Sequence, residues 1–488
     1  VYFSLIALVT AAIFAVDLNL YGYWGFRLDG SVLIYLSDPG EALASASWGE
    51  VLRQILIMLV YAGAMIWSYR WILRLFRVEP VPLRGRIVPT VAALLIGGLT
   101  FLAIRGGTGA SVANVSKVYF SSNMFLNHAA TNPVFSFLSS VGDNENYAEA
   151  YPFFEEERRK TLFEELRGNR PGADAGTPRL LRSDRPNVVL ILLESFGRTI
   201  MDETVNGEPV MPNMQRFKRE GVWFENFFAN SFRTDRGQVA VLCGFPAQTT
   251  MSIMKLPRKS ATLPSLARSL GREGYRSVFM YGGDLNFTNQ ASFMYSTGWE
   301  ELIWQKDMQL DAPTSKWGYA DDVVVDLFGD EVEALGRAEQ PFLAGLLTLS
   351  SHEPFEVPFA KFDDKLLNAM AFSDAQIGRL IDRLRESPVW NNLLVVLVAD
   401  HGYPYPYDLA YNAPLRHRIP MIWLRLPNSR SVCLANRHLR YASGADGPSA
   451  RRIRLQQEYF RSDSAPQVRL LLFQRRVRRD RRRRRNGL

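Results

Sequence analysis

Two apolar runs that end in acidic residues carry the residue types in this chain that are best suited to chemistry. One run spans Asn187 to Leu193 and is followed by Glu194, and the other spans Leu393 to Ala399 and is followed by Asp400 and His401. Such runs are typical of strands buried on both faces of a parallel sheet, and ligands bind beyond the carboxyl ends of these strands. We therefore expect Glu194, Asp400 and His401 to meet at one edge of a sheet.

A candidate nucleophile, Thr234, lies between the two runs, in the segment Arg233 to Gly237. We expect it at the start of a helix that continues through Val239 to Leu242, with Asp235 as a cap. A hydroxyl at this place lies in the positive field of the helix amino terminus and can reach a metal, and both effects favour attack on phosphorus or sulfur. The alternative role for Thr234 is that of a plain helix cap.

Glu194, Asp400, His401 and the Thr234 hydroxyl together offer two carboxylates, one imidazole and one alkoxide. Hard, oxygen-rich ligands of this kind suit Mn, Mg or Zn. A divalent ion there would hold the nucleophile as alkoxide and polarise a phosphoryl oxygen. Taken singly, Glu194 has the alternative role of a surface acid at a strand end, and the Asp400-His401 pair that of a turn.

Four further residues are candidates for substrate contacts. His352 follows the apolar run Phe342 to Leu349 and could donate to phosphate oxygens, the alternative being a loop cap. Arg233 and Arg236 flank Thr234 and could bind an oxyanion, or could pair with neighbouring acids. His417 is a candidate contact to the substrate or leaving group, with a loop role as its alternative.

Strands and helices alternate between the two acid-terminated runs. We expect helices near Met211 to Gly221, after Thr234 and near Leu263 to Gly274, and a further strand at Ser277 to Tyr281. This alternation predicts an α/β fold with a mostly parallel sheet flanked by helices on both faces.

Three stretches near the N-terminus have the composition of membrane helices: residues 1–16, 53–73 and 87–104. The chain does not begin with Met, so we expect it to begin inside a truncated helix. A cleaved signal peptide is the alternative for the first stretch, and buried core helices of a soluble protein for all three. Arginines crowd the loop between the second and third stretches, whereas acids predominate between Asp17 and Glu50. The positive-inside rule then places everything after Arg105 outside the cytoplasm.

The net charge of +8 is concentrated at the C-terminus. Residues 429–488 hold 17 arginines and 4 acids, a balance of +13, which leaves 40 basic and 45 acidic residues, or −5, in residues 1–428. We therefore expect no nucleic-acid partner for the body of the protein. Only two cysteines occur, Cys243 and Cys433, so no disulfide framework is indicated. Composition divides the chain into a membrane region (1–105), a helical connector (106–182), a catalytic domain (183–428) and an Arg-rich tail (429–488).

The motifs Val188 to Ser195, Phe232 to Gly237 with Ser252 to Lys255, Tyr281 to Asp284, Ser351 to Phe355 and Ala399 to Gly402 resemble those of the lipoteichoic acid synthase branch of the sulfatase-like, alkaline phosphatase superfamily. The resemblance implies a membrane-anchored enzyme with an extracytoplasmic sulfatase-like domain. Such an enzyme moves phosphoglycerol from a phosphatidylglycerol-like lipid onto a threonine and then to a glycan or glycolipid acceptor. It also implies one divalent ion, usually manganese, bound by Glu194, Thr234, Asp400 and His401, with phosphate held by His352.

Two features depart from the family pattern. Where the synthases carry a Trp and an Arg that contact glycerol phosphate, this chain has Asn286 to Gln290, which leaves the donor head group and the acceptor open. The tail has two interpretations, a basic arm for lipid or nucleic acid, or a frameshift. We favour the frameshift, because back-translation in a shifted frame gives a pattern like the family's usual carboxyl end.

Three other functions remain as alternatives to phosphoglycerol transfer. Phosphoethanolamine transferases use the same scaffold but usually carry several disulfides, and sulfatases carry a modified Cys or Ser where this chain has Thr234. The third alternative is a non-catalytic, lipid-binding membrane regulator. We expect the protein in the cell (inner) membrane, as a multi-pass protein in contact with the lipid bilayer.

Overall fold

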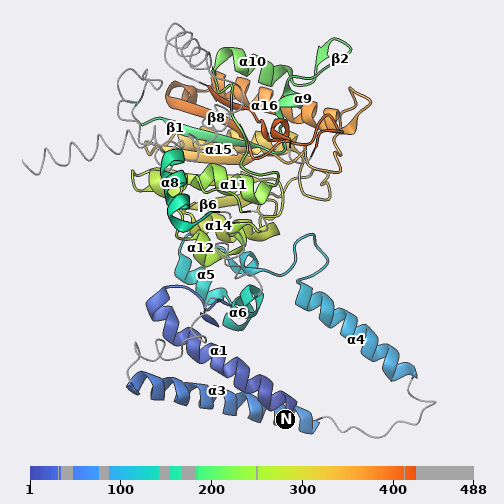
Figure 1. Cartoon of the computed structure of the whole chain (residues 1–488). Coiled ribbons are helices and arrows are strands. Elements are labelled where there is room, and N and C mark those ends of the chain that lie inside the picture. The colour runs from blue at the N-terminus through green and yellow to red at the C-terminus, as the bar shows by residue number, and fades with distance from the viewer. Residues whose placement is uncertain are drawn as a thin grey trace, which may run out of the picture. The chain divides into compact units, whose positions relative to one another are not determined.

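The computed structural model describes residues 1–30, 32–33, 48–75, 87–141, 154–167, 183, 185–248, 251–410 and 413–424. The chain divides into two compact units, Val1–Phe153 and Phe154–Leu488, each of which is described by itself (Figure 1). The predicted Arg-rich tail and its frameshift lie outside the described residues, as does Cys433.

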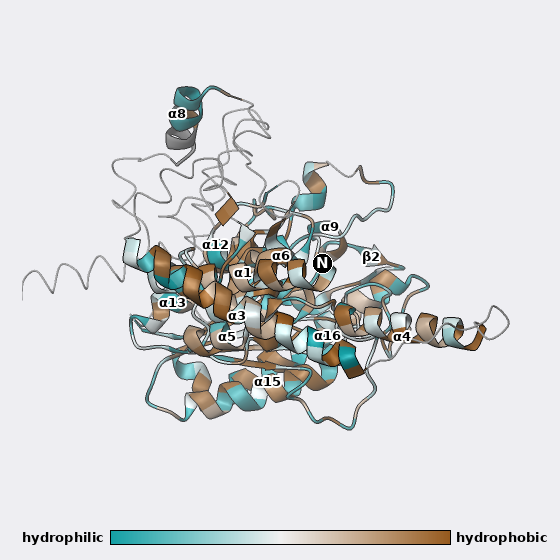
Figure 2. Cartoon of the chain, turned by 90° about the horizontal axis from the view of Figure 1, so that it is seen from below, coloured by the Kyte–Doolittle hydropathy of each residue, from teal (hydrophilic) through white to brown (hydrophobic). Residues whose placement is uncertain are grey.

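Three long apolar helices form most of the first unit: α1 (Tyr2–Trp24), α3 (Trp48–Leu75) and α4 (Ile87–Arg105). All three are long and apolar enough to cross a membrane. Figure 2, coloured by hydropathy, shows hydrophobic residues along much of α1. α1 packs against α3, where the rings of Phe14 and Tyr61 stack with their centroids 5.9 Å apart.

The expected end of the first apolar helix at residue 16 is wrong, because α1 continues to Trp24. The charge at Asp17 does not end the helix because its carboxylate is paired inside the unit. The Asp17 carboxylate accepts hydrogen bonds from the Leu28 amide at 2.8 Å and from the Arg27 guanidinium at 2.5 Å. A buried carboxylate that accepts hydrogen bonds from two protein donors does not have to be exposed to water, so the helix can continue past this residue.

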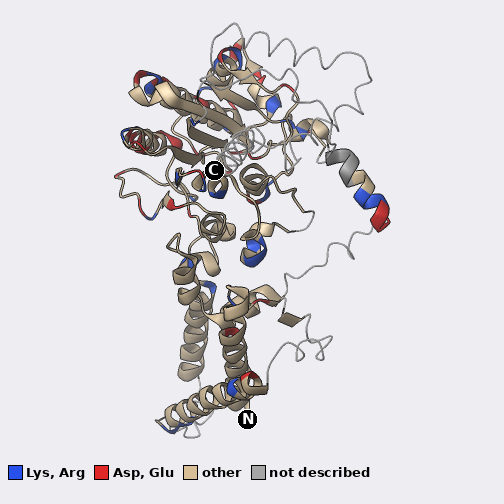
Figure 3. Ribbon diagram, turned by 90° about the vertical axis from the view of Figure 1, so that its left-hand side faces the viewer, with Lys and Arg blue, Asp and Glu red and all other residues tan. Residues whose placement is uncertain are grey.

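Shorter elements follow α4 in the first unit: η3 (Val115–Val118), α5 (Met124–Ala130) and α6 (Pro133–Ser140). The second unit begins with α8 (Glu156–Arg167), which lies within the stretch predicted as a helical connector, residues 106–182. Figure 3 shows acidic and basic residues along this helix. The ion pair between Lys160 and Glu156, 2.7 Å apart, is highly exposed and contributes little to stability.

A seven-stranded sheet forms the centre of the second unit, in the order β4-β9-β8-β1-β7-β5-β6. Its strands are β1 (Asn187–Leu193), β4 (Val222–Trp223), β5 (Arg276–Tyr281), β6 (Glu301–Trp304), β7 (Phe342–Leu347), β8 (Leu393–Ala399) and β9 (Met421–Leu424). Every pairing is parallel except those of β9, which runs antiparallel to β4 and β8. The predicted mostly parallel sheet is confirmed.

The two acid-terminated runs are neighbours at the centre of this sheet. β1 pairs with β8 over its whole length, from Asn187 opposite Leu393 to Leu193 opposite Ala399. Both strands are almost completely buried, which explains why neither shows the apolar and polar alternation of a half-exposed strand. This register brings Glu194 and Asp400 to the same edge.

Helices cover both faces of the sheet. In Figure 1, β1 and β8 lie between α10 (Pro212–Glu220) and α16 (Lys365–Glu386) above and α11 (Thr234–Cys243), α12 (Pro257–Ser260) and α14 (Gln290–Ser296) below. The remaining helices are α9 (Arg198–Met201), α13 (Leu266–Gly271) and α15 (Asp321–Gly336), with the short turns η5 (Ile253–Lys255), η6 (Phe287–Asn289), η7 (Pro388–Asn392) and η8 (Pro414–His417). A two-stranded hairpin, β2 (Thr204–Val205) and β3 (Glu208–Pro209), lies apart from the main sheet.

The helix expected near Leu263 to Gly274 is shorter than predicted. α13 begins after Ser265, whose hydroxyl accepts a hydrogen bond from the Arg268 amide at 3.1 Å. The chain then turns through Gly274, which has a φ of 83°. A side-chain cap at one end and a left-handed glycine after the other confine the helix.

Candidate active site

The ends of β1 and β8 are tied together just beyond the last strand residues. The Ser195 amide donates to the Asp400 carboxylate at 3.0 Å, and the Asp400 amide donates to the Leu193 carbonyl at 3.4 Å. Ser195 has a φ of 61°, so the chain turns sharply after Glu194. The turn leaves both carboxylates at the carboxyl edge of the sheet.

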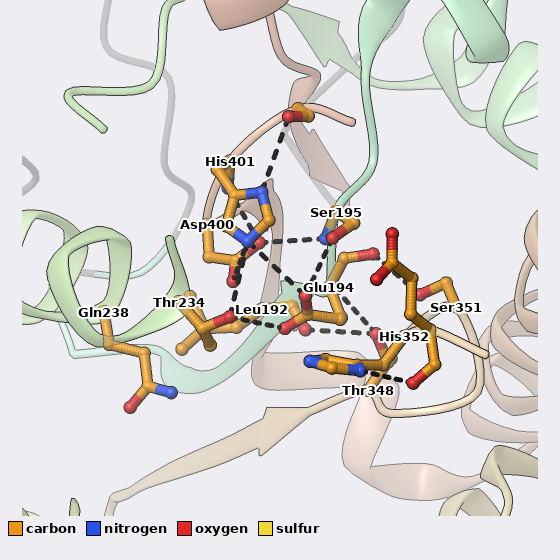
Figure 4. Close-up of polar contacts among 12 residues, drawn as sticks. Leu192, Glu194, Ser195, Thr234, Gln238, Thr348, Ser351, His352, Asp400 and His401 are labelled. Carbon is orange, nitrogen blue, oxygen red and sulfur yellow. Dashed lines mark hydrogen bonds and ion pairs between the residues drawn. The ribbon is translucent and has the colours of Figure 1, made fainter. Parts of the chain in front are cut away.

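Glu194, Asp400 and His401 form one buried group (Figure 4). Their possible ligand atoms all lie within 4.8 Å of one another. His401 Nε2 is 3.4 Å from Glu194 Oε1 and 3.6 Å from Asp400 Oδ2. The structure therefore brings together the three residues that the sequence predicted to meet.

Thr234 joins this group from the first position of α11. Its Oγ1 lies 3.0 Å from Glu194 Oε2 and 3.3 Å from His401 Nε2. Thr234 is half-buried, and its hydroxyl faces the acid and the imidazole. A hydroxyl at the amino end of a helix, in contact with these two groups, is suited to lose its proton.

Gly237 allows α11 to approach the end of β8 this closely. A Cβ built at this position would lie 2.3 Å from the Asp400 carbonyl oxygen. Any other residue would therefore push the helix away from the strand, and Thr234 with it. The glycine that closes the motif Arg233 to Gly237 is explained by this contact.

The expected capping role of Asp235 is wrong. The residue before the helix, Arg233, is the N-cap and makes no side-chain capping bond. Asp235 lies inside the first turn and is buried, and its Oδ1 has no hydrogen-bond partner among the described residues. Its carbonyl accepts a hydrogen bond from the Ser252 hydroxyl at 2.8 Å.

The buried acids and the histidine shift one another's pKa values. Burial works to raise the pKa of Glu194, but its hydrogen bond and charge interaction with His401 lower it overall. Burial, and then the nearby charge of Glu194, raise the pKa of Asp400. Burial works to lower the pKa of His401, but the two carboxylates raise it to about 9. The imidazole therefore carries a proton at neutral pH when no other positive charge is present to balance the two carboxylates.

The same group fits a divalent cation. Asp400 Oδ2 is buried and makes no hydrogen bond within the described part of the chain. A buried carboxylate oxygen of this kind is costly unless a charge balances it. Two carboxylates, one imidazole and a hydroxyl, converging within contact distance, form a donor set that divalent ions accept.

The structure also brings His352 near this group, from the loop after β7. Two bonds hold that loop against Glu194: the Glu194 amide donates to Thr348 Oγ1 at 2.9 Å, and the Ser351 hydroxyl donates to the Glu194 carbonyl at 2.7 Å. His352 lowers the pKa of Glu194 through its charge, after the larger effects of burial and His401. Its Nδ1 lies 2.8 Å from the Glu353 carbonyl, which leaves Nε2 for a ligand (Figure 4).

Trp317 is a neighbour of His352 that sequence reasoning missed. Its ring lies 4.7 Å from the His352 ring, between centroids, and its Nε1 donates to the Glu353 carbonyl at 2.7 Å. Phe287 packs edge-on against the other side, at 5.3 Å. The sequence signal that could have pointed to Trp317 was the glycine that follows it, Gly318, which has a φ of 143°. A Cβ built at Gly318 would lie 2.1 Å from the Gly282 carbonyl oxygen.

The two arginines that flank Thr234 have different surroundings. Arg233 is exposed. Arg236 is buried, with its guanidinium carbon 5.6 Å from the centroid of the Phe232 ring, and its Nε has no hydrogen-bond partner in the described residues.

His417 reaches the neighbourhood of the site from η8, at the other side of the loop after β8. It is half-buried, and its side chain bonds to the backbone of Ser231. Burial, and then the charge of Arg416, lower its pKa, and His401 adds a smaller effect of the same sign. A neutral imidazole at this place is able to accept or donate a proton.

Comparison with known proteins assigns this site to a family. The sulfatase family profile matches residues 186–438, which include every candidate site residue. The chain belongs to the sulfatase family. The match covers more than half of the chain and confirms the predicted superfamily and fold class.

Sequence relatives of this sulfatase-family chain are named phosphoglycerol transferase I. The protein of that name from Xanthomonas campestris pv. campestris is 35% identical over 251 residues, which cover 46% of this chain and 35% of the relative. The one from Escherichia coli is 26% identical over 234 residues, covering 44% of this chain and 30% of the relative. The chain thus matches about a third of the length of these curated relatives. The matches support the predicted transferase or hydrolase type of enzyme.

A solved structure supports the fold. The lipoteichoic acid synthase LtaP from Listeria monocytogenes superposes with a TM-score of 0.50 at 19% identity, covering 55% of this chain and 72% of that chain. At this identity the likeness concerns the fold, an α/β domain with a mostly parallel central sheet flanked by helices.

Proposed function

We propose that this chain is a metal-dependent phosphoglycerol transferase in which Thr234 is the nucleophile. The observation that carries the proposal is the contact of Thr234 Oγ1 with both Glu194 and His401, at 3.0 and 3.3 Å, beside a buried carboxylate oxygen that lacks a hydrogen bond. A threonine that served only as a helix cap would not require contacts of its hydroxyl with a buried carboxylate and an imidazole. The names of the sequence relatives supply the transferred group.

Glu194, Thr234, Asp400 and His401 would hold one divalent ion, manganese by family resemblance, with magnesium or zinc as alternatives. When bound, such an ion supplies charge that stabilises the threonine alkoxide and polarises a phosphoryl oxygen. The raised pKa of His401 means that its imidazole gives up a proton when it becomes a ligand.

The reaction then takes two displacements at phosphorus. In the first, Thr234 Oγ1 forms a bond to the phosphorus of a phosphatidylglycerol-like lipid, and the bond from phosphorus to the diacylglycerol oxygen breaks. The threonine proton passes to the surrounding bases and the leaving oxygen gains one. In the second, an acceptor hydroxyl attacks the phosphoglyceryl-threonine, the bond from Thr234 Oγ1 to phosphorus breaks, and the threonine regains its proton. No net oxidation or hydrolysis is needed.

Four basic residues near Thr234 have roles that follow from their positions. We assign the Nε2 of His352 to a non-bridging phosphate oxygen, since Nδ1 is occupied by the Glu353 carbonyl. We assign His417 to the leaving or entering oxygen, because a neutral imidazole exchanges protons readily. Arg233 is exposed enough to meet the head group or its phosphate, and buried Arg236 would supply positive charge behind Thr234.

The donor and acceptor follow from the relatives and from the three apolar helices. A phospholipid donor suits an enzyme with membrane helices in its chain, and we assign a glycan or glycolipid as acceptor. The arginines between the second and third helices support a cytoplasmic loop there, hence a multi-pass protein whose catalytic domain, about residues 183–428, lies outside the cytoplasm. Residues 1–105 are then the membrane region and 106–182 the connector.

Intact-protein mass spectrometry tests the proposal. The full-length chain, purified in detergent, is incubated with manganese and phosphatidylglycerol in the absence of acceptor. We expect an adduct with the mass of a phosphoglyceryl group, mapped by peptide fragmentation to Thr234. Thr234→Ala should form none, and Thr234→Ser, which keeps a hydroxyl, should form it.

A second threonine variant serves as the control. Thr262 is exposed, and its hydroxyl donates to the Lys259 carbonyl rather than to any site residue, so Thr262→Ala should form the adduct like the wild type. A phosphoethanolamine adduct from mixed lipids would retain the mechanism and change the donor. An absence of both adduct and bound manganese in the folded wild-type protein would refute the proposal and favour a non-catalytic membrane regulator.

A further inference from the structure

The segment that follows the third membrane helix is almost devoid of charge. Residues 106–141, here called the exit segment, contain one charged residue, Lys117, whereas 22% of the whole chain is charged. The segment begins where α4 ends, and Arg105 fixes that junction by donating to the carbonyls of Gly107 and Gly109 at 2.6 and 3.0 Å. A stretch of this length on a water-facing surface normally carries several charges.

The exit segment buries six of its polar side chains and exposes seven of its large apolar ones. In α5, Asn127 and His128 are 0% and 2% exposed, whereas Phe125 on the same helix is 62% exposed. Phe120, after η3, and Leu138, in α6, are 57% and 61% exposed. The other members of the two sets are buried Ser111, Ser116, Thr131 and Ser136, and exposed Val112, Val118, Leu126 and Val141. This arrangement is the reverse of that in a water-soluble domain.

Local asparagines satisfy the backbone of these short elements. The side chains of Asn114, Asn123 and Asn132 each accept from an amide in the first turn of η3, α5 and α6 respectively. Buried Asn127 accepts from the amides of Phe120 and Ser121, at 2.9 and 3.0 Å, and donates to the Ser121 carbonyl. Backbone groups that are paired within the segment do not depend on water, which an apolar environment requires.

The buried side of the exit segment is attached to the end of α1. The Arg27 guanidinium donates to the His128 carbonyl at 2.6 Å and to Asp17 at 2.5 Å. The Tyr21 hydroxyl lies 3.1 Å from His128 Nδ1. Burial, and then the charge of Arg27, lower the pKa of His128 to about 4, so its imidazole is neutral. One polar cluster thus holds the segment by its inner side and leaves the apolar side outward.

We propose that the exit segment lies in the surface layer of the lipid bilayer, with Val112, Val118, Phe120, Phe125, Leu126 and Leu138 in the acyl boundary. The outward apolar side is continuous along the chain with α4, a helix fit to cross the membrane, so the bilayer is within reach of it. The near absence of charge favours lipid over a polar protein partner, and short elements of this kind sink about 5–10 Å into the boundary between head groups and chains. This inference rests on the exposure of the segment and is independent of the transferase activity.

Spin labels on the full-length protein test the proposal. Cys433→Ser gives the parent, because Cys243 is buried and its pKa is raised to about 12, so that it does not react with a thiol label. Single cysteines replace Phe120, Phe125 or Leu138, each an exposed position. Leu95→Cys, exposed on α4, is the membrane control, and Glu339→Cys, exposed in the second unit, is the aqueous control.

Each labelled protein is placed in nanodiscs of phosphatidylethanolamine and phosphatidylglycerol, and collision rates with oxygen and with a water-soluble nickel chelate are measured. We expect the ratio of oxygen to nickel collisions at the three test positions to exceed that at Glu339→Cys and to fall below that at Leu95→Cys. A ratio equal to that of the aqueous control would overturn the proposal. So would labels shielded from both reagents, which would indicate cover by protein, or a Leu95→Cys label that reads as aqueous.

Discussion

The described residues of each unit include a buried cluster of ionisable groups, and these two clusters differ in whether their charges balance. In the first unit, Asp17 is paired with Arg27, and the neighbouring His128 is neutral. In the second, Glu194 and Asp400 face one imidazole, and Asp400 Oδ2 has no hydrogen bond. A balanced cluster can serve as a joint between segments. An unbalanced one is stabilised by a cation from outside, which is why we regard the second as a site and the first as a scaffold.

Among the substitutions that test this comparison, Gly237→Ala should have the largest effect on the transfer rate. Because the added methyl would meet the Asp400 carbonyl, α11 must shift and Thr234 must leave its contacts with Glu194 and His401. We expect the transfer rate to fall about a hundredfold or more, since misplacement by about 1 Å has that cost. The rate of phosphoglycerol transfer from phosphatidylglycerol, compared between variant and wild type, measures this fall.

The control for that change is Gly271→Ala, at the end of α13, where a Cβ would meet nothing within 4 Å. It should leave the rate near that of the wild type. If Gly237→Ala retained full activity with an unaltered melting temperature, close approach of α11 to β8 would not be what positions the nucleophile.

Manganese affinity of the second cluster should rise with pH. His401, with its pKa raised to about 9, and Asp400, whose pKa is also raised, bind protons that compete with the metal. Below these pKa values each proton that must leave weakens binding by roughly tenfold per pH unit. Calorimetry between about pH 6 and 8, in buffers of different ionisation enthalpy, measures both affinity and proton release.

An affinity that is independent of pH in this range, with no proton released, would contradict the unbalanced state of the cluster. Asp400→Asn removes one of the two carboxylates and one competing proton. We expect it to bind manganese more weakly and with a shallower pH dependence.

Asp17→Asn should destabilise the cluster of the first unit without affecting manganese binding by the cluster of the second. The substitution leaves Arg27 without its carboxylate partner inside the first unit, and breaking a buried pair in this way costs about 3–5 kcal/mol. We expect a lower melting temperature in detergent and an unchanged manganese affinity. Arg105→Gln, at the other junction of the exit segment, removes only solvent-exposed hydrogen bonds and should be milder. A loss of manganese binding in folded Asp17→Asn would show that the two clusters are coupled.

Trp317→Leu should have the smallest effect, about tenfold in kcat, because it leaves the ligands in place and removes the ring against His352 and the hydrogen bond from Nε1 to the Glu353 carbonyl. Trp317→Phe, which keeps an aromatic face, should recover most of the activity. We expect KM to change little, since the ring acts through His352. Equal losses in both variants, or an effect confined to KM, would argue against a positioning role for Trp317.

Much of the sheet was predictable because buried parallel strands are continuous apolar runs. The runs before Glu194 and Asp400 became β1 and β8 with the expected bounds, and α10 lies within the expected helix. Prediction failed at two acidic residues. Asp17 did not end α1, because Arg27 and Leu28 pair with its carboxylate. Asp235 does not cap α11, because the helix already begins at Thr234 and places Asp235 inside its first turn.

The sequence by itself determined which functional groups the chain carries and at which strand and helix ends they stand, because those ends follow from runs of neighbouring residues. Only the tertiary structure decided that they meet. Ser195 and Asp400 are 205 positions apart, and Thr234 and His401 are 167 apart, yet each pair is in contact. Burial, charge balance and pKa depend on such neighbours in space. The buried Asp400 oxygen without a hydrogen bond, the Trp317 ring on His352 and the outward apolar side of the exit segment therefore appear only in the folded chain.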